Sequence, residues 1–177
     1  MKKIILLDRD GVINYDSLNY IRTVDEFIFI PGSINAIVRL TQAGYRIGIA
    51  TNQSGIARGY YNAQDLAAIH TKMYQAIHAA GGEIEAIEYC PHHPDEGCLC
   101  RKPRGGMLLT LGLRFNTSLT GIPFLGDKIS DIQAAQVVGG VAVLIAEKDS
   151  PVDQLRQQNY PNVPRFNSLA DYVDTIL

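Results

Sequence analysis

The sequence has no tryptophan, only three cysteines and no long hydrophobic run. All three cysteines fall within residues 90–100, so they do not form the distributed disulfide framework of a small extracellular protein. No apolar stretch approaches the roughly 20 residues that span a bilayer. The apolar run at residues 4–7 follows two lysines but is too short for the core of a signal peptide. These absences predict a soluble, cytoplasmic protein.

A large excess of charge is also missing. The formal net charge is -2, which gives the chain no bulk attraction to nucleic acid or to anionic membranes. A length of 177 residues, 46% of them hydrophobic, suits one domain with a substantial buried core. We therefore expect a single domain over residues 1–177 that acts as a monomer on a small molecule, without a nucleic-acid or membrane partner.

Short apolar runs alternate with amphipathic stretches along the chain. The predicted strands cover residues 3–7, 45–51, 84–90, 122–127 and 141–146. The predicted helices cover residues 33–44, 62–82, 106–115, 130–140 and 168–177. Ser33 and Asn62 are the predicted N-caps of the first two helices, and Gly44 ends the first. The alternation predicts an α/β protein with a central parallel sheet between two layers of helices.

Polar and charged side chains follow the predicted strands. Open α/β sheets bind ligands at the carboxyl ends of their strands, so these residues are the candidates for a site. They lie at residues 8–11, 51–55, 101–102 and 127–131. We expect them to meet at one edge of the sheet.

The acidic residues among them are Asp8, Asp10, Asp127 and Asp131. Taken alone, the Asp8–Asp10 pair is equally compatible with a solvated turn. Three or four converging carboxylates repel one another unless a cation neutralises them, and hard oxygen ligands suit Mg²⁺. The set therefore predicts a magnesium site.

The turn at residues 51–55, TNQSG, offers hydroxyls, amides and backbone N–H groups that can surround an anion. An ordinary β-turn is the alternative, but a nearby Lys102 favours a phosphate. Mg²⁺, an accessible Asp, a hydroxyl and a lysine together fit phosphoryl transfer, in which catalysis is mostly positioning and charge neutralisation.

Residues 90–100, CPHHPDEGCLC, hold all three cysteines and two of the four histidines. A disulfide would leave one cysteine over, and cytosolic thiols stay reduced. A catalytic thiol would lack a base of its own. A closed tetrahedral zinc site is favoured, with the ligands Cys90, His92, Cys98 and Cys100. Such a site would fix the two cations that follow it, Arg101 and Lys102.

The segments DRDGVIN, ATNQSG, RKP and GDKISD resemble, in order and spacing, the four motifs of the haloacid dehalogenase (HAD) superfamily of phosphatases. With CPHHP and CLCRKP added, the set resembles the narrower D-glycero-D-manno-heptose 1,7-bisphosphate 7-phosphatase group. The related histidinol-phosphate phosphatases share the zinc loop. The resemblance implies a capless, three-layer HAD-like Rossmannoid fold with a zinc-stapled loop.

The implied activity is Mg²⁺-dependent removal of the 7-phosphate from the heptose bisphosphate. It would serve the synthesis of nucleotide-activated heptose for the lipopolysaccharide core or a related glycan. The alternatives are a histidinol-phosphate phosphatase and a non-enzymatic, zinc-containing binding module.

The resemblance also implies the roles of four residues. Asp8 would attack phosphorus and form an aspartyl-phosphate. Asp10 would protonate the leaving oxygen and then activate water. Thr51 and Lys102 would hold the phosphoryl oxygens as charge develops.

The metal ligands follow from the same resemblance. Mg²⁺ would be bound by the carboxylates of Asp8 and Asp127 and by the backbone carbonyl of Asp10, while Asp131 would orient the metal's surroundings. His92 is favoured as the zinc ligand over its neighbour His93.

The substrate is expected to contact four parts of the chain. The expected residues are Asp16, Ser17, Leu18, Asn19, Asn52, Gln53, Ser54, Arg58, Arg101 and Lys128. His70 and His78 have no partner at a ligand spacing and are interpreted as structural or exposed. Only HPDEG separates His92 from Cys98, a shorter insertion than in several family members, and the sequence leaves the preferred anomer open.

Overall fold

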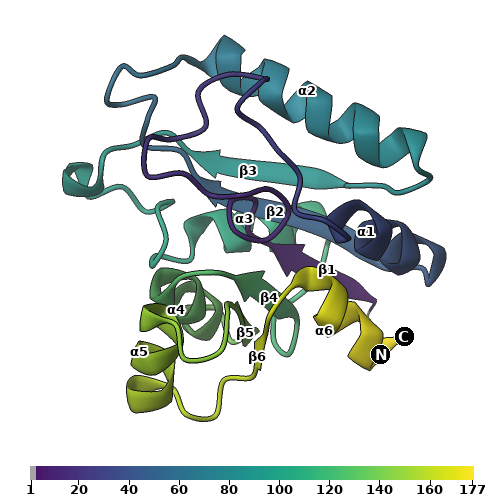
Figure 1. Ribbon diagram of the computed structural model, residues 1–177. Helices are drawn as coiled ribbons and strands as arrows, with labels where there is room; N and C mark the ends of the chain where they lie inside the picture. The colour runs from purple at the N-terminus through teal and green to yellow at the C-terminus, as the bar shows by residue number, and fades with distance from the viewer. Residues whose placement is uncertain (1–2) are drawn as a thin grey trace.

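A single parallel sheet of six strands organises the chain (Figure 1). The computed structural model describes residues 3–177, and the strand order is β3-β2-β1-β4-β5-β6. The strands are β1 (Ile4–Leu7), β2 (Arg46–Asn52), β3 (Ala86–Cys90), β4 (Pro123–Gly126), β5 (Val141–Ile145) and β6 (Arg165–Phe166). The chain builds the sheet outward from β1 to β3, then returns to add β4 on the other side of β1. The strand order therefore reverses between β1 and β4, which is where such sheets bind ligands.

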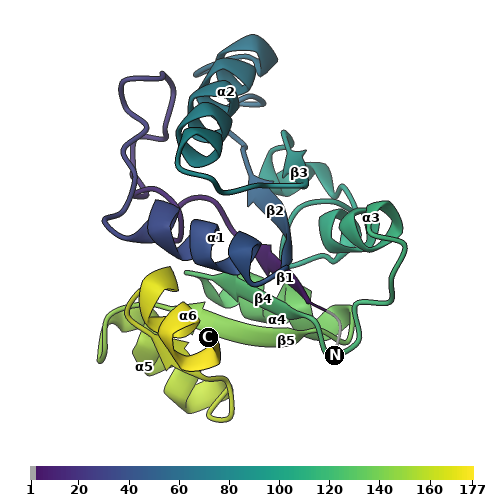
Figure 2. The same cartoon turned by 90° about the vertical axis from the view of Figure 1, so that its right-hand side faces the viewer.

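Helices cover both faces of this sheet (Figure 2). They are α1 (Ser33–Gln42), α2 (Ala63–Ala79), α3 (Gly106–Arg114), α4 (Ile129–Val137), α5 (Pro151–Asn159) and α6 (Leu169–Ile176), with a short 3₁₀ helix η1 (Pro94–Glu96). Successive strand residues point to opposite faces. Ile5 and Leu7 join one core with α1, α2 and α6, and Ile4 and Leu6 join the other with α3 and α4. The predicted three-layer α/β/α fold is confirmed.

Local sequence signals place the start of α2 correctly but not that of α1. Asn62 caps α2, because its side chain accepts hydrogen bonds from the backbone of Gln64 and Asp65. The prediction that Ser33 caps α1 is wrong: the N-cap is Gly32, and the Ser33 hydroxyl donates instead to the carbonyl of Ile13. That bond ties the start of α1 to the loop after β1.

Two elements, α5 and β6, were not expected from the sequence. Helix α5 is largely polar and has one fully buried residue, Asp153, so apolar periodicity does not reveal it. Its signals are the Ser150 cap and Pro151 in the first turn. Strand β6 has only two residues, too few for an alternating pattern.

The segment between β1 and α1, residues 11–32, contains no helix or long strand. Two isolated bridges, Asp10–Asn14 and Asn14–Phe29, hold it, and Phe27 anchors it in the core. Within residues 3–177 no separate cap lies over the sheet edge, as the capless fold implies. The described helices include none that is long and apolar enough to cross a membrane.

Candidate active site

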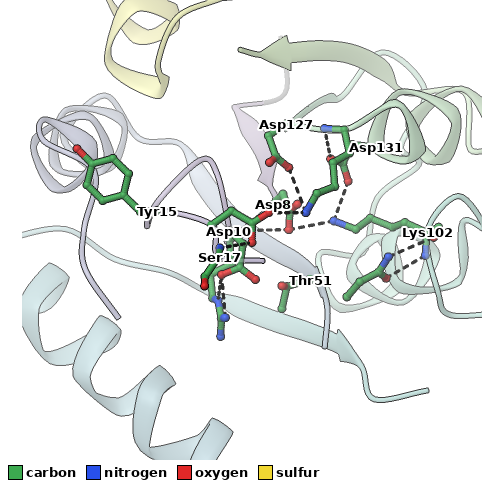
Figure 3. A network of polar contacts seen from close by, with 12 residues as sticks. Asp8, Asp10, Tyr15, Ser17, Thr51, Lys102, Asp127 and Asp131 are labelled. Atoms are coloured by element: carbon green, nitrogen blue, oxygen red, sulfur yellow. Dashed lines mark hydrogen bonds and ion pairs between the residues drawn. The ribbon is translucent and has the colours of Figure 1, made fainter. Parts of the chain in front are cut away.

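The predicted acidic residues and Lys102 meet at the carboxyl ends of β1 and β4 (Figure 3). Asp8 follows β1, and Asp127 follows β4. Lys102 Nζ lies 2.9 Å from Asp8 Oδ1 and 2.8 Å from Asp131 Oδ1, and all three side chains are almost fully buried. We call Asp8, Asp10, Asp127 and Asp131 the acidic cluster.

Lys102 is held at both ends of its side chain. Its Nζ also donates to the carbonyl of Ala50, at 2.8 Å. Its backbone N–H and carbonyl form two hydrogen bonds with the Asn52 side chain, each 3.1 Å. Burial lowers the pKa of Lys102, but the charges of Asp131 and Asp8 outweigh this and raise the pKa above its ordinary value. Lys102 is therefore a fixed cation.

One lysine does not neutralise the acidic cluster. Burial and neighbouring carboxylates raise the pKa of Asp8 to about 7 and that of Asp127 to about 8. Asp127 Oδ1 is buried without a hydrogen bond, since Lys128 Nζ stays 3.9 Å away. Carboxylate oxygens of Asp8, Asp127 and Asp131 lie within 4.8 Å of one another. This donor set fits a hard divalent cation such as Mg²⁺.

Two glycines let the backbone approach this cluster. Gly11 has a φ of 79°, and a Cβ there would collide with the Asp127 carboxylate. A Cβ on Gly126 would collide with Asp131 in the same way. The glycines of DRDG and LGD are therefore required by the close packing of backbone against carboxylate.

Asp10 and Thr51 are joined through Gln53. Gln53 Nε2 donates to Thr51 Oγ1 at 2.9 Å and to Asp10 Oδ2 at 3.1 Å, and its Oε1 accepts from the hydroxyl of Tyr61. Burial raises the pKa of Asp10, but the charge of Arg9 and hydrogen bonds from Asn14 and Arg9 outweigh it, so the pKa is lowered overall.

A pocket of about 520 Å³ opens above these residues. Among the residues expected to bind substrate, the pocket is lined by Asp16, Ser17, Leu18, Asn52, Gln53, Ser54, Arg58, Arg101 and Lys128. Asn19 instead lines a neighbouring hollow with Tyr20 and Tyr60, and Thr51 is fully buried beside the pocket. Sequence reasoning missed Tyr20, Ile21, Pro103 and Ser130, which also line it.

The pocket's cations have different surroundings. Arg101 has a buried Nη1 without a hydrogen-bond partner, so a donor is available to an anion. The Arg58 guanidinium lies 5.9 Å from the centre of the Tyr20 ring. Lys128 Nζ pairs with Asp16 at 2.9 Å, linking the loop after β1 to the loop after β4.

The predicted zinc ligands gather in the loop formed by residues 90–100, which we call the zinc loop. Cys100 Sγ lies 3.2 Å from both Cys90 Sγ and His92 Nδ1, and Cys90 Sγ lies 3.6 Å from Cys98 Sγ. None of the three cysteines forms a disulfide. His93 turns away and caps η1, accepting from the Asp95 backbone. Three thiols and one imidazole at these spacings fit a closed zinc site.

The zinc loop is attached to the turn at residues 51–55 through strand pairing. Asn52 is opposite Cys90 where β2 and β3 end, and the Gln53 N–H donates to the Cys90 carbonyl at 2.8 Å. The Ala57 N–H donates to the Pro91 carbonyl. Lys102 follows two residues after the last ligand, so ordering of the loop bears directly on its position.

The sequence and structure match known phosphatases. The polynucleotide kinase 3 phosphatase family model matches residues 3–150. The D-glycero-β-D-manno-heptose-1,7-bisphosphate 7-phosphatase of Pseudomonas aeruginosa is 52% identical over 144 residues, 81% of each chain. The enzyme of that name from Neisseria meningitidis is 41% identical over 99% of this chain and 95% of its own.

A solved structure agrees with these relatives. The D,D-heptose 1,7-bisphosphate phosphatase of Bordetella bronchiseptica, in complex with magnesium and phosphate, matches with a TM-score of 0.91 and 41% identity. The match covers 99% of this chain and 98% of the other. The chain belongs to the polynucleotide kinase 3 phosphatase family of HAD-type phosphatases. Within that class it is a member of the D-glycero-β-D-manno-heptose-1,7-bisphosphate 7-phosphatase family.

The family bears on two alternatives left by the sequence. The chain is an enzyme, a phosphoric monoester hydrolase, and not a zinc-containing binding module. The relatives carry the heptose bisphosphate name, which disfavours the histidinol-phosphate alternative.

The two histidines of α2 differ. His78 is exposed, whereas His70 is buried with its Nε2 3.1 Å from Arg9 Nη1. Both positions fit the expectation of a structural or exposed residue. The contact of His70 with Arg9, which itself pairs with Asp10, could not be foreseen, because 61 residues separate the two.

Proposed function

We propose that the protein removes the 7-phosphate of D-glycero-β-D-manno-heptose 1,7-bisphosphate and leaves the 1-phosphate in place. One observation carries the proposal: Asp8, Asp10, Thr51 and Lys102 meet beside one pocket. The chain that contains them is 52% identical to a phosphatase named for this substrate. The β anomer is proposed because the relatives' names specify it.

Asp8 is the proposed nucleophile. One of its oxygens attacks the 7-phosphorus, the ester P–O bond breaks, and an aspartyl-phosphate forms. Lys102, 2.9 Å from Asp8, neutralises the nucleophile and the approaching phosphoryl oxygens. The Thr51 hydroxyl supplies a further hydrogen bond to those oxygens.

Asp10 is the proposed general acid and base. It gives a proton to the departing sugar oxygen, then takes one from the water that hydrolyses the aspartyl-phosphate. Its lowered pKa favours the ionised form at rest, which is the form that activates water. For the first step Asp10 must gain a proton, and a phosphate monoester monoanion carries one.

The metals have separate proposed sites. The carboxylates of Asp8 and Asp127 and the backbone carbonyl of Asp10 would hold Mg²⁺, which supplies charge neutralisation for phosphoryl transfer. Asp131 would position Lys102 and the metal's surroundings, since it touches Lys102 and caps α4 through the Lys128 N–H. Zn²⁺ in the zinc loop would be structural.

The second phosphate of the substrate fits the cationic side of the pocket. Arg101 offers an unpartnered buried N–H, and Arg58 lies across the same pocket. Asp16, Ser17 and the amides of Asn52 and Gln53 offer hydrogen bonds to sugar hydroxyls. Leu18, Asn19, Ser54 and Lys128 complete the proposed substrate-binding set.

The proposed setting follows from the chemistry of the product. A heptose 1-phosphate is suited to nucleotide activation, so we place the enzyme in the synthesis of activated heptose for a lipopolysaccharide core or related glycan. It would act as a cytoplasmic, single-domain monomer without nucleic acid. The net charge of -2 supports this last point.

A substrate panel tests the proposal. Steady-state kcat/KM would be measured with both anomers of heptose 1,7-bisphosphate, with fructose 1,6-bisphosphate and with histidinol phosphate. The β-heptose bisphosphate should give the highest value. A preference for histidinol phosphate or fructose 1,6-bisphosphate would overturn the proposed substrate while leaving the phosphatase chemistry intact.

A further inference from the structure

Arg9 is the largest fully buried side chain in the described protein, and each of its partners has a defined position. Its Nε and Nη2 donate to Asp10 Oδ1 at 3.1 and 2.8 Å. Its Nη1 lies 3.1 Å from His70 Nε2, and its guanidinium lies 5.6 Å from the centre of the Phe27 ring. A buried cation needs such partners, since an unpaired one is strongly destabilising.

The chemistry of arginine fixes the state of His70. A guanidinium can only donate hydrogen bonds, so His70 Nε2 is the acceptor and the ring proton lies on Nδ1. Burial and the charge of Arg9 lower the pKa of His70 to about 4, in keeping with a neutral ring. His70 therefore holds one end of Arg9 as an uncharged acceptor.

Asp10 receives different numbers of donors on its two oxygens. Arg9 Nε, Arg9 Nη2 and Asn14 Nδ2, the last at 2.8 Å, all donate to Oδ1. Among residues 3–177, only Gln53 Nε2 donates to Oδ2, at 3.1 Å. Oδ1 is thus saturated, and Oδ2 is the oxygen with free capacity to carry a proton.

We propose that His70 is a positioning residue for proton transfer: through Arg9 it locks Asp10 so that Oδ2 serves as the proton-transferring oxygen. The inference rests on the proposed function, in which Asp10 protonates the departing oxygen. In that step the ester P–O bond breaks, the bond from phosphorus to Asp8 forms, and the proton on Asp10 Oδ2 moves to the departing oxygen.

The effect of His70 follows from the two hydrogen bonds that the Arg9 guanidinium donates to Asp10 Oδ1. Without an acceptor at Nη1, the guanidinium can pivot toward another partner and lose one of its two bonds to Oδ1. Asp10 is then held less firmly, by Asn14, Gln53 and one bond from Arg9, and its carboxylate can shift away from the reactive orientation. Small displacements of a proton donor lower the rate of proton transfer far more than they weaken substrate binding.

Two aryl phosphates isolate this step. Phenyl phosphate has a basic leaving group that needs a proton, whereas the leaving group of p-nitrophenyl phosphate departs readily without one. The parameter kcat/KM reports the chemistry up to the first irreversible step, so it includes leaving-group protonation and excludes later hydrolysis.

The decisive comparison is His70→Leu against His70→Gln. Leucine removes the acceptor, and glutamine restores one through its carbonyl. His70→Leu should lower kcat/KM for phenyl phosphate roughly 10- to 100-fold, a part of the roughly 10²- to 10⁴-fold attributed to general acid catalysis, and that for p-nitrophenyl phosphate less than about threefold. His70→Gln should stay within about threefold of the wild type on both substrates.

Arg9→Lys gives an independent reading if His70→Leu does not fold. A lysine cannot form both hydrogen bonds to Asp10 and also reach His70. The same selective loss of kcat/KM for phenyl phosphate is therefore expected. Where both variants fold, the double variant should be no worse than the poorer single one, because both changes break one chain of contacts.

Three results would overturn the proposal. These are an equal loss on the two aryl phosphates, no loss in a folded His70→Leu protein, and a loss in His70→Gln as large as in His70→Leu. The wild type's preference among sugar phosphates does not enter this test, so failure of the proposed substrate is distinguishable. An Asp8→Asn protein that still hydrolysed p-nitrophenyl phosphate would instead refute the aspartyl-phosphate mechanism itself.

Discussion

The acidic cluster and the zinc loop lie side by side but obtain their shapes from different sources. Asp8 and Asp127 are placed by two paired strands, and Lys102 is already bonded to Asp8, Asp131 and Ala50. The zinc loop begins at Cys90, the last residue of β3, and otherwise contains only the three residues of η1 as regular structure. The ligand atoms of Cys90, His92, Cys98 and Cys100 lie within 4.8 Å of one another, and of these residues only Cys90 belongs to a strand.

The difference shows two uses of a metal. In the acidic cluster the fold holds the carboxylates close together, so they repel one another. A bound cation relieves this repulsion. In the zinc loop little other structure holds the ligands in this geometry without a metal. The free energy of metal binding therefore contributes to the free energy of folding. Mg²⁺ should therefore exchange readily, and Zn²⁺ should remain through dialysis.

The largest expected effect comes from Asp8→Asn. Phosphatase activity should fall roughly 10⁴-fold or more, the order seen when a nucleophile is removed. Stability in metal-free buffer should stay equal or rise at pH 8, because burial and neighbouring charges raise the Asp8 pKa to about 7 and the ionised form is disfavoured. Steady-state rates measure the activity, and thermal melts measure the stability. Retained activity would refute the role of Asp8.

Cys98→Ser tests the other side of the comparison. We expect loss of zinc by elemental analysis, easier proteolysis within residues 91–104, and a fall in activity of roughly 10- to 100-fold, as for residues that support a metal site. Leu99→Ser is the matched control, since Leu99 is exposed between two ligands and supplies none. Full zinc content in Cys98→Ser would contradict the proposed ligand set.

The stabilisation by Mg²⁺ should depend on pH. The folded-state pKa values of Asp8 and Asp127, about 7 and about 8, lie above the ordinary 3.8. Their contribution to metal-free stability is therefore full below pH 3.8 and is lost as the pH rises through 7 and 8.

Mg²⁺ competes with protons for these carboxylates, so the rise in melting temperature on adding Mg²⁺ should be larger at pH 8 than at pH 6. Thermal melts with and without MgCl₂ across this range measure it. Asp8→Asn should flatten the dependence, and an equal shift at every pH in the wild type would be the contrary result.

The smallest effect is expected for Asp16→Asn. The Asp16–Lys128 pair is half-exposed, and such pairs contribute about 0–1 kcal/mol, so unfolding by urea should show a change within that range. KM should rise a few-fold, because Asp16 lines the pocket, with kcat nearly unchanged. A large fall in kcat would show that the pair also supports the chemistry.

The sequence predicted the parts of the protein that follow from local pattern. Strand ends carry the acidic cluster because apolar runs and the residues after them are contiguous in the chain. The candidate zinc ligands could be predicted because three of the four lie within residues 90–98 and the fourth follows at Cys100. Parallel pairing then brings these local features to one edge, as general rules for α/β sheets require.

What escaped prediction depends on contacts between distant segments or on weak local signals. The Arg9–His70 contact joins the loop after β1 to the middle of α2, and no spacing rule connects them. Tyr20 lines the pocket because its loop folds back there with a backbone φ of 66°. Tyrosine rarely adopts this conformation, so the sequence does not predict it. Helix α5 buries too little apolar surface to give its sequence a helical pattern of hydrophobic residues.

The position of the zinc loop at the sheet margin has an evolutionary consequence. Strand β3 is the outermost strand on its side, and residues 95–97 are exposed and belong to neither hydrophobic core. Insertions or deletions between His92 and Cys98 can therefore accumulate without disturbing the sheet, while the ligands on either side keep Arg101 and Lys102 in register. A lineage can thus vary the length of this loop while the catalytic residues keep their positions.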